Sequence, residues 1–226
     1  MTAPPRFEAR GVVVDGTATR YRVYVPPDAA PPLPVILFLH GAGESGVDDV
    51  LPTTVGIGPA IAAMPERFPA LVVFPQASRG YGWRGFNLGA AVAALDDVER
   101  AFATERERVY VTGISMGDYG TWLLALQQPE RFAAIAPVCG GLDRTASGLT
   151  PARAARRLAS IPHWVFHGDA DNVIAVDESR VMVQALRAAG AAVRYTEYAG
   201  VRHNSWDRAY AEPELMPWLL QQRRQR

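Results

Sequence analysis

The chain has 226 residues, and its 23 basic residues balance its 23 acidic residues, so the formal net charge is zero. This length predicts one domain, residues 1–226, with a sizeable core. The balanced charge gives no sign of an electrostatic nucleic-acid partner, and no apolar run approaches membrane-spanning length. We therefore expect neither nucleic acid nor a membrane as a partner.

The single cysteine, Cys139, excludes an internal disulfide framework. It ends an apolar segment, which favours a buried and inert thiol. The four histidines show no metal-ligand spacing, so we expect no metal ion and no cofactor. The N-terminal segment, residues 1–8, lacks the apolar core of a signal peptide, which predicts a cytoplasmic location. A monomer and a homodimer are both compatible with the sequence.

Two strands are expected first, over residues 9–14 and 20–25, with a hairpin turn at Asp15-Gly16 between them. A continuous apolar run, 34–39, is typical of a buried parallel strand. Strands and helices alternate after this point. Further strands are predicted over residues 71–74, 108–114, 132–138, 163–167 and 193–198. Helices are predicted over residues 57–64, 88–102, 121–128, 152–159, 176–189 and 210–222.

Antiparallel strands followed by repeated strand–helix units predict an α/β fold, with a mostly parallel central sheet, N-terminal antiparallel strands and helices on both faces. No insertion is long enough for a large lid. Ligands of such folds bind at the carboxyl ends of the strands. The candidate site residues therefore matter because each of them follows a predicted strand.

The strongest motif is Gly113-Ile114-Ser115-Met116-Gly117, which follows an apolar strand and opens a helix at Met116. This arrangement is typical of a nucleophile elbow, in which a serine hydroxyl stands out of a tight turn. Glycines on both sides let neighbouring chains approach closely, and the helix directs free backbone N–H groups at the serine. The motif predicts Ser115 as a nucleophile; the alternative is an ordinary Gly/Ser turn.

A serine nucleophile needs a general base. His203 lies in the loop that opens onto the final predicted helix, and we predict it as the base. The other histidines have simpler interpretations: His40 supports a glycine-rich loop, His163 starts a strand, and His167 packs beside an acidic loop.

The base needs a carboxylate that fixes its tautomer. Asp169 and Asp171 both follow the predicted strand 163–167, and either could be an ordinary turn residue. We predict Asp171, because it lies further out, where the loop turns into the next helix. The chain order Ser115, Asp171, His203 is the one expected for this type of fold.

The oxyanion that forms during acyl transfer needs two backbone donors. The first predicted donor is the N–H of Met116, directly after the serine. The second is the N–H of Ala42, in the loop Gly41-Ala42-Gly43 after a buried strand, where glycines allow close approach.

Four segments together resemble compact esterases of the α/β-hydrolase superfamily, including carboxylesterase/phospholipase, dienelactone-hydrolase-like and feruloyl-esterase-like proteins. The segments are FLHGAGE (38–44), GISMG (113–117), HGDAD (167–171) and GVRHNSW (200–206). The resemblance covers nearly the whole chain. It implies the α/β-hydrolase fold, a Ser–Asp–His triad and hydrolysis of a small soluble ester through an acyl-enzyme.

Two residues depart from these relatives. Family members often carry a second glycine where this chain has Asp118, whose carboxylate would add negative potential near the site and disfavour anionic substrates. Dienelactone hydrolases proper use a cysteine nucleophile, so the serine at position 115 argues against that specific activity.

The loop 78–87 carries Tyr81, Trp83 and Phe86 between glycines, which predicts an aromatic wall for an acyl or aryl group. A surface loop anchored by Trp83 is an equally open alternative. Trp206, shortly after the predicted base, either lines the same pocket or packs the final helix.

The leading functional hypothesis is a serine carboxylic-ester hydrolase that acts on short-chain acyl esters or on aryl, feruloyl-type esters. A small serine peptidase or amidase of the same fold is the first alternative. The second is a hydrolase-fold protein that binds a small ligand without turnover. The sequence leaves the natural acyl and alcohol groups open.

Overall fold

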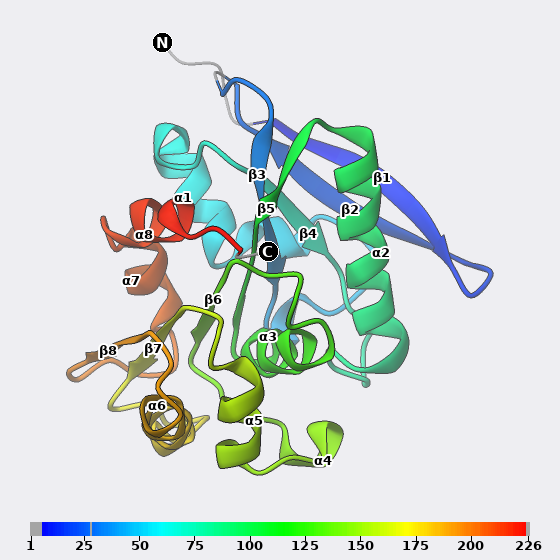
Figure 1. Ribbon diagram of the computed structural model, residues 1–226. Helices are drawn as coiled ribbons and strands as arrows, with labels where there is room; N and C mark the ends of the chain where they lie inside the picture. Colours follow the sequence, from blue (N-terminus) through cyan, green and yellow to red (C-terminus); the bar gives the residue numbers. More distant parts are fainter. Residues whose placement is uncertain (1–5, 28, 225–226) are drawn as a thin grey trace.

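The computed structural model describes residues 6–27 and 29–224. Its sheet has eight strands in the order β1-β2-β4-β3-β5-β6-β7-β8 (Figure 1). The strands are β1 (Arg6–Val14), β2 (Thr17–Val25), β3 (Leu33–Leu39), β4 (Leu71–Pro75), β5 (Thr104–Ile114), β6 (Ala134–Val138), β7 (His163–Gly168) and β8 (Val193–Tyr198). The β1–β2 and β2–β4 pairs are antiparallel, and the pairs from β4 across to β8 are parallel. The predicted mostly parallel sheet with N-terminal antiparallel strands is confirmed.

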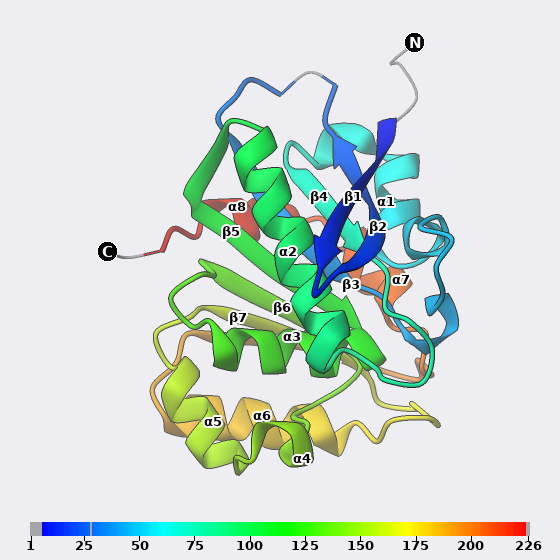
Figure 2. The same cartoon turned by 90° about the vertical axis from the view of Figure 1, so that its right-hand side faces the viewer.

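Helices cover both faces of this sheet. The α-helices are α1 (Ile57–Ala63), α2 (Gly85–Ala101), α3 (Met116–Gln127), α4 (Arg144–Ser147), α5 (Pro151–Leu158), α6 (Asp177–Ala188), α7 (Trp206–Ala211) and α8 (Leu215–Gln221). Short 3₁₀ turns cover Ala42–Glu44, Leu51–Thr54 and Pro65–Arg67. Helices α2, α3, α5 and α6 pack on one face, and α1, α7 and α8 pack on the other (Figures 1 and 2).

The central strands are apolar along their length because both of their faces are covered. Every residue of β3, β4, β6 and β7 is buried. Successive residues of a strand point to opposite faces. Leu37 and Val73 therefore pack with Trp122 of α3 in one core cluster, while Ile36 and Val72 belong to the cluster under α1, α7 and α8.

The C-terminal region differs from the prediction. One helix is expected over residues 210–222, but the structure has two, α7 and α8. Pro213 explains the break, because proline has no N–H for the helix ladder and disfavours helical angles at the preceding residue; Glu212 accordingly has a ψ of 117°. Helix α2 also begins earlier than predicted, which places Phe86 in a helix rather than in a loop.

The longest segment between two elements is residues 76–84, after β4, in keeping with the expectation that no large lid covers the sheet. None of the described helices is long and apolar enough to cross a membrane. Residues 1–5, on which the expectation about an N-terminal leader partly rests, lie outside the described residues.

Candidate active site

The candidate site begins at the carboxyl end of β5. Ser115 forms the turn from this strand into α3, with φ 52° and ψ −114°. A positive φ is strained for a residue with a side chain. A Cβ atom at Gly117 would lie 1.9 Å from the carbonyl oxygen of Leu39, and one at Gly113 would lie 2.3 Å from the carbonyl oxygen of Gly117. The tight packing of β3, β5 and α3 around the serine therefore requires both glycines.

The Ser115 hydroxyl lies within hydrogen-bond distance of a histidine from a distant part of the chain. His203, in the loop between β8 and α7, has its Nε2 2.9 Å from Ser115 Oγ. Its Nδ1 lies 2.7 Å from Oδ2 of Asp171, in the loop after β7. Because the carboxylate accepts a hydrogen bond from Nδ1–H, Nε2 is left without a proton and can accept one from the serine. The structure thus brings together the three side chains predicted as nucleophile, base and acid.

Asp171 is buried and fully hydrogen-bonded. Its side chain is 0 % exposed, and Oδ1 accepts hydrogen bonds from the backbone N–H groups of Val173 (2.8 Å) and Ile174 (3.0 Å). Burial raises the pKa of this carboxyl, but the hydrogen bonds from His203 and from the two backbone N–H groups outweigh it and hold the pKa below its ordinary value. Asp171 is therefore an ionised carboxylate at neutral pH.

Asp169, the alternative acid, makes different contacts. Its Oδ1 accepts a hydrogen bond from the backbone N–H of Gly200 at 2.7 Å, and its own N–H donates to the carbonyl oxygen of Tyr198 at 3.1 Å. Asp169 thereby ties the loop after β7 to the loop that carries His203.

The two predicted oxyanion donors, Ala42 and Met116, share a hollow of about 500 Å³. The other lining residues are Gly43, Ser45, Arg79, Gly80 and Gly82. Met116 is the first residue of α3, so its N–H has no acceptor within the helix. Two backbone donors beside one hollow are what an oxyanion requires, and the role of Ala42 and Met116 as these donors stays a prediction.

His40 orients the peptide that carries the Ala42 N–H. The backbone N–H of Ala77 donates to His40 Nε2 at 3.0 Å, so the ring proton lies on Nδ1, which donates to the carbonyl oxygen of Gly41 at 2.6 Å. The C=O and N–H of a trans peptide point in opposite directions, so the Ala42 N–H points away from the ring. Burial lowers the pKa of His40 to about 4. The indole N–H of Trp83 donates to the His40 carbonyl at 2.9 Å and completes this support.

The four aromatic residues predicted to bind substrate lie in different environments. Tyr81 is 76 % exposed and Trp83 only 3 %, and both line a hollow of about 550 Å³ over the start of α3. Phe86 lies in the first turn of α2 and lines adjacent hollows instead. Trp206 begins α7, and its ring meets the His203 ring edge-on at 5.4 Å. The role of these four residues in binding stays a prediction.

Asp118 is buried beneath the elbow, in the first turn of α3. Neither carboxyl oxygen makes a hydrogen bond of normal geometry to the described residues. Burial raises the pKa of Asp118 well above its ordinary value, although the side chain of Trp122 and the backbone N–H groups of Gly140 and Gly141 oppose the rise. This burial disfavours the charged form and so works against the negative potential expected from the sequence.

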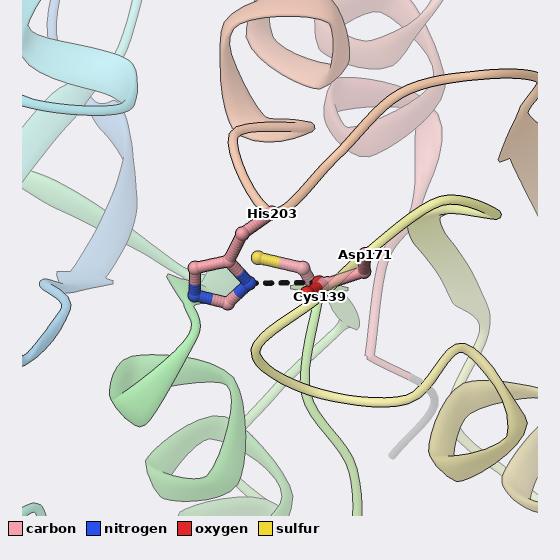
Figure 3. A group of neighbouring side chains, drawn as sticks. All are labelled: Cys139, Asp171 and His203. Carbon is pink, nitrogen blue, oxygen red and sulfur yellow. Dashed lines mark hydrogen bonds and ion pairs between the residues drawn. The ribbon is translucent and has the colours of Figure 1, made fainter.

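Cys139 lies beside the base and the acid (Figure 3). It follows β6 with φ 52° and is fully buried. Its Sγ, an oxygen of Asp171 and a nitrogen of His203 lie within 4.8 Å of one another, and within the described part of the chain no other group of three such side chains has metal-ligand geometry. Burial raises the pKa of the thiol, and the Asp171 oxygen already accepts a hydrogen bond. The donor set therefore favours hydrogen bonding over metal binding, and the absence of a metal stays a prediction.

His167 is a site residue that the sequence favours only as a packing residue. Its Nε2 lies 3.1 Å from Asp171 Oδ2. The available signal was its position at the end of β7, four residues before the acid. A residue in that position reaches the acid loop only if the loop folds back over the strand, which spacing alone does not reveal.

Comparison with known proteins identifies the class of this protein. The sequence model of the dienelactone hydrolase family matches residues 85–212, more than half of the chain. The chain therefore belongs to the dienelactone hydrolase family. Its fold is the α/β-hydrolase fold, the family is one of hydrolases, and the solved structures that the chain resembles include esterases and an acylaminoacyl peptidase of Pyrococcus horikoshii.

Several of the proteins that this chain resembles are longer than it is. The structure of a thermostable esterase superposes with a TM-score of 0.81 and 32 % identity, over 96 % of this chain and 63 % of that one. A ferulic acid esterase superposes with a TM-score of 0.75 at 18 % identity, over 96 % of this chain and 99 % of that one, which shows the common fold alone. An uncharacterized secreted protein of Arthroderma benhamiae is 25 % identical over 88 % of this chain. The chain spans about a quarter to a half of the length of the curated relatives it matches.

Proposed function

We propose that this protein is a serine carboxylic-ester hydrolase that works through an acyl-enzyme. The observation that carries the proposal is the hydrogen-bonded row Ser115–His203–Asp171 at a strained turn. Ser115 Oγ attacks the ester carbonyl carbon while His203 Nε2 takes its proton, and the N–H groups of Ala42 and Met116 stabilise the oxyanion. His203 then returns the proton to the leaving alcohol. A water molecule, activated by the same base, hydrolyses the acyl-enzyme.

The substrates we propose are small soluble esters with a short acyl or an aryl group. The hollow over the start of α3 supports this choice, because it is lined by the rings of Tyr81, Trp83 and Tyr119. Its charged lining is paired: Arg84 with Asp143, and Arg144 with Glu178. Paired charges and aromatic rings favour an uncharged planar or short aliphatic group over a strongly charged one.

The test is hydrolysis of matched substrates by the full chain. We expect turnover of p-nitrophenyl acetate, p-nitrophenyl butyrate and methyl ferulate, together with covalent labelling by a fluorophosphonate probe. The matched amide, p-nitroacetanilide, should be much slower. Comparable kcat/KM for ester and amide would support the serine peptidase or amidase alternative. Neither turnover nor labelling would support the ligand-binding protein and contradict our proposal.

The remaining expectations stay predictions. A small-molecule ester is the partner that the site calls for, and monomer and homodimer both stay open. The single-domain organisation over residues 1–226 and the cytoplasmic location are likewise predictions from the sequence, and one similar protein is described as secreted.

A further inference from the structure

A second histidine contacts the proposed catalytic acid. His167, in β7, is fully buried, and its Nε2 lies 3.1 Å from Asp171 Oδ2, the oxygen that also accepts from His203 Nδ1 at 2.7 Å. The same Nε2 lies 3.1 Å from the carbonyl oxygen of Ile174. Two imidazole rings therefore meet at one carboxylate oxygen, and the proposed mechanism uses only one of them.

The contacts of the His167 ring decide which nitrogen carries its proton. Both neighbours of Nε2, the Asp171 carboxylate and the Ile174 carbonyl, only accept hydrogen bonds, so Nε2 must carry the hydrogen. Nδ1 lies 2.7 Å from Ser179 Oγ, and the serine hydroxyl can donate to it. If Ser179 instead donated to the carbonyl of Gly140, 3.2 Å away, Nδ1 would carry the proton and the bare Nε2 would face two oxygens. Burial lowers the pKa of His167 and so keeps a single proton on the ring.

We propose that His167 is a positioning residue that acts through Asp171. Its Nε2–H donates to Oδ2, shares that oxygen with His203 and holds it in place beside the His203 ring. This inference rests on the proposed function and adds a residue to it. Without the His167 donor, the carboxylate would interact more strongly with His203 alone, which stabilises the protonated form of the base. The base would then stay protonated, and inactive, up to a higher pH.

The other titratable groups around this cluster do not produce the same effect. Cys139 after β6 is buried, and burial raises the pKa of its thiol. Glu197 on β8 is hydrogen-bonded by Arg180, which lowers its pKa to about 2, and burial raises the pKa of Tyr119 on α3 to about 12. Burial also raises the pKa of Asp118. Asp118 is present in every variant compared below, so its titration does not contribute to the differences between their pH profiles.

Three variants separate positioning from packing. His167→Leu removes both ring nitrogens, whereas His167→Gln keeps an N–H donor near the position of Nε2. Ser179→Ala removes the partner of Nδ1 but leaves Nε2–H with its two acceptors. The measurements are kcat, KM and the pH profile of kcat/KM with a short-chain chromogenic ester, together with the melting temperature of each variant.

For His167→Leu we expect kcat to fall about tenfold, the effect of one hydrogen bond to a charged group, with KM little changed. The acidic limb of the kcat/KM profile should move up by about half a pH unit or more. His167→Gln should restore most of kcat and the position of the limb. Ser179→Ala should lower the melting temperature and leave the limb in place. An unshifted limb in folded His167→Leu, a Gln variant as impaired as the Leu variant, or the same shift in Ser179→Ala would each overturn the proposal.

A measurement on the unsubstituted protein covers the case in which His167→Leu does not fold. NMR spectra of ¹⁵N-histidine-labelled protein report which ring nitrogen carries the proton. We expect the Nε2–H tautomer for His167, and the Nδ1–H tautomer would overturn the inference. Because this readout needs no turnover, an inactive protein would contradict the proposed function, while a wrong tautomer would contradict the role of His167.

Discussion

At the residue scale, buried neighbours fix the proton positions in the site. His40 receives an N–H at Nε2 and donates from Nδ1, while His203 donates from Nδ1 to Asp171 and faces the serine with Nε2. Each ring therefore has one suitable neutral tautomer. Protonation of His40 would set a second N–H against the Ala77 N–H, and protonation of His203 would remove the lone pair that accepts the serine proton.

His163 gives a prediction about stability in acid. It is fully buried at the start of β7, neither ring nitrogen has a hydrogen bond of normal geometry, and the ring stacks on Trp122 at 5.6 Å. Burial lowers its pKa from 6.5 to about 3. Between these values the unfolded chain binds the proton and the folded chain does not, so the free energy of unfolding falls as the pH falls.

The variant His163→Phe keeps a stacked ring and removes this titration. Its melting temperature should fall less than that of the unsubstituted protein between about pH 7 and about pH 4. Thermal unfolding followed by circular dichroism at both values checks this. Equal losses in the two proteins would show that His163 does not contribute to acid sensitivity.

Asp118 gives a prediction of the opposite sign. Burial raises the pKa of this carboxyl well above its ordinary value of 3.8, so the folded chain holds a proton that the unfolded chain has lost. The free energy of unfolding therefore falls as the pH rises above that ordinary value. Asp118→Asn should raise the melting temperature at neutral pH, with a gain that shrinks toward about pH 4. Calorimetry at both values is the check; a lower melting temperature at neutral pH would mean that the carboxyl itself is needed there.

Local motifs predict some contacts of the site and miss others. Ser115, Asp171 and His203 are predictable because a turn motif and a fixed chain order carry them. Two other contacts depend on side-chain distances: the hydrogen bond between His167 and Asp171, and the hydrogen bond from His40 to the Gly41 carbonyl. Sequence spacing does not give those distances.

At the element scale, the elbow depends on how closely α3 approaches β3. Gly117→Ala places a Cβ atom 1.9 Å from the Leu39 carbonyl oxygen, and this clash with backbone should cost more than about 4 kcal/mol or prevent folding. The control is Gly89→Ala in α2, where a Cβ atom meets nothing within 4 Å. That change should stabilise by about 0.5–1 kcal/mol. Urea unfolding measures the free energy of unfolding of both variants. Similar changes in the two would contradict the close approach of α3 to β3.

The segment 76–84 carries Tyr81, which we propose to bind substrate, and Trp83, which supports the His40 loop; substitution should separate these two roles. Tyr81→Ala should raise KM for aryl esters more than for acetyl esters, with an unchanged melting temperature, because the ring is mostly exposed. Trp83→Phe keeps a ring but loses the N–H that donates to His40, so it should lower kcat for all esters alike. Steady-state kinetics across acetyl, butyryl and feruloyl esters decide this. If only Trp83→Phe changed the selectivity among the esters, the roles of Tyr81 and Trp83 would be the reverse of those proposed.

Some boundaries of helices and strands can be predicted from local sequence signals, and others cannot. The hairpin turn is set by Asp15 and Gly16, which both adopt positive φ, 47° and 76°, as the favoured two-residue turn requires. The break at Pro213 has an equally local cause, but the apolar pattern of residues 210–222 hides it. Helix α2 starts early, at Gly85, where Asn87 of its first turn hydrogen-bonds to Ser78 and Gly82 of the preceding loop, and the sequence pattern does not reveal these contacts.

At the scale of the whole molecule, alternation of strands and helices predicts a parallel sheet but not its strand order. The order β4-β3-β5-β6-β7-β8 follows from crossovers whose packing partners are distant in sequence. That order places the carboxyl ends of β5, β7 and β8 along one edge of the sheet, from which Ser115, Asp171 and His203 meet. The fold therefore assembles the site from segments spread over more than eighty residues of chain.

The central claim is that Ser115 becomes acylated. The most direct measurement is intact mass after treatment with a fluorophosphonate probe, followed by peptide mapping, for the unsubstituted protein and for Ser115→Ala. We expect one adduct on the unsubstituted protein, located at Ser115, and none on the variant. The variant should keep its melting temperature and lose roughly 10⁴-fold or more in kcat for esters. Labelling of the variant to the same extent, or turnover near that of the unsubstituted protein, would contradict the account.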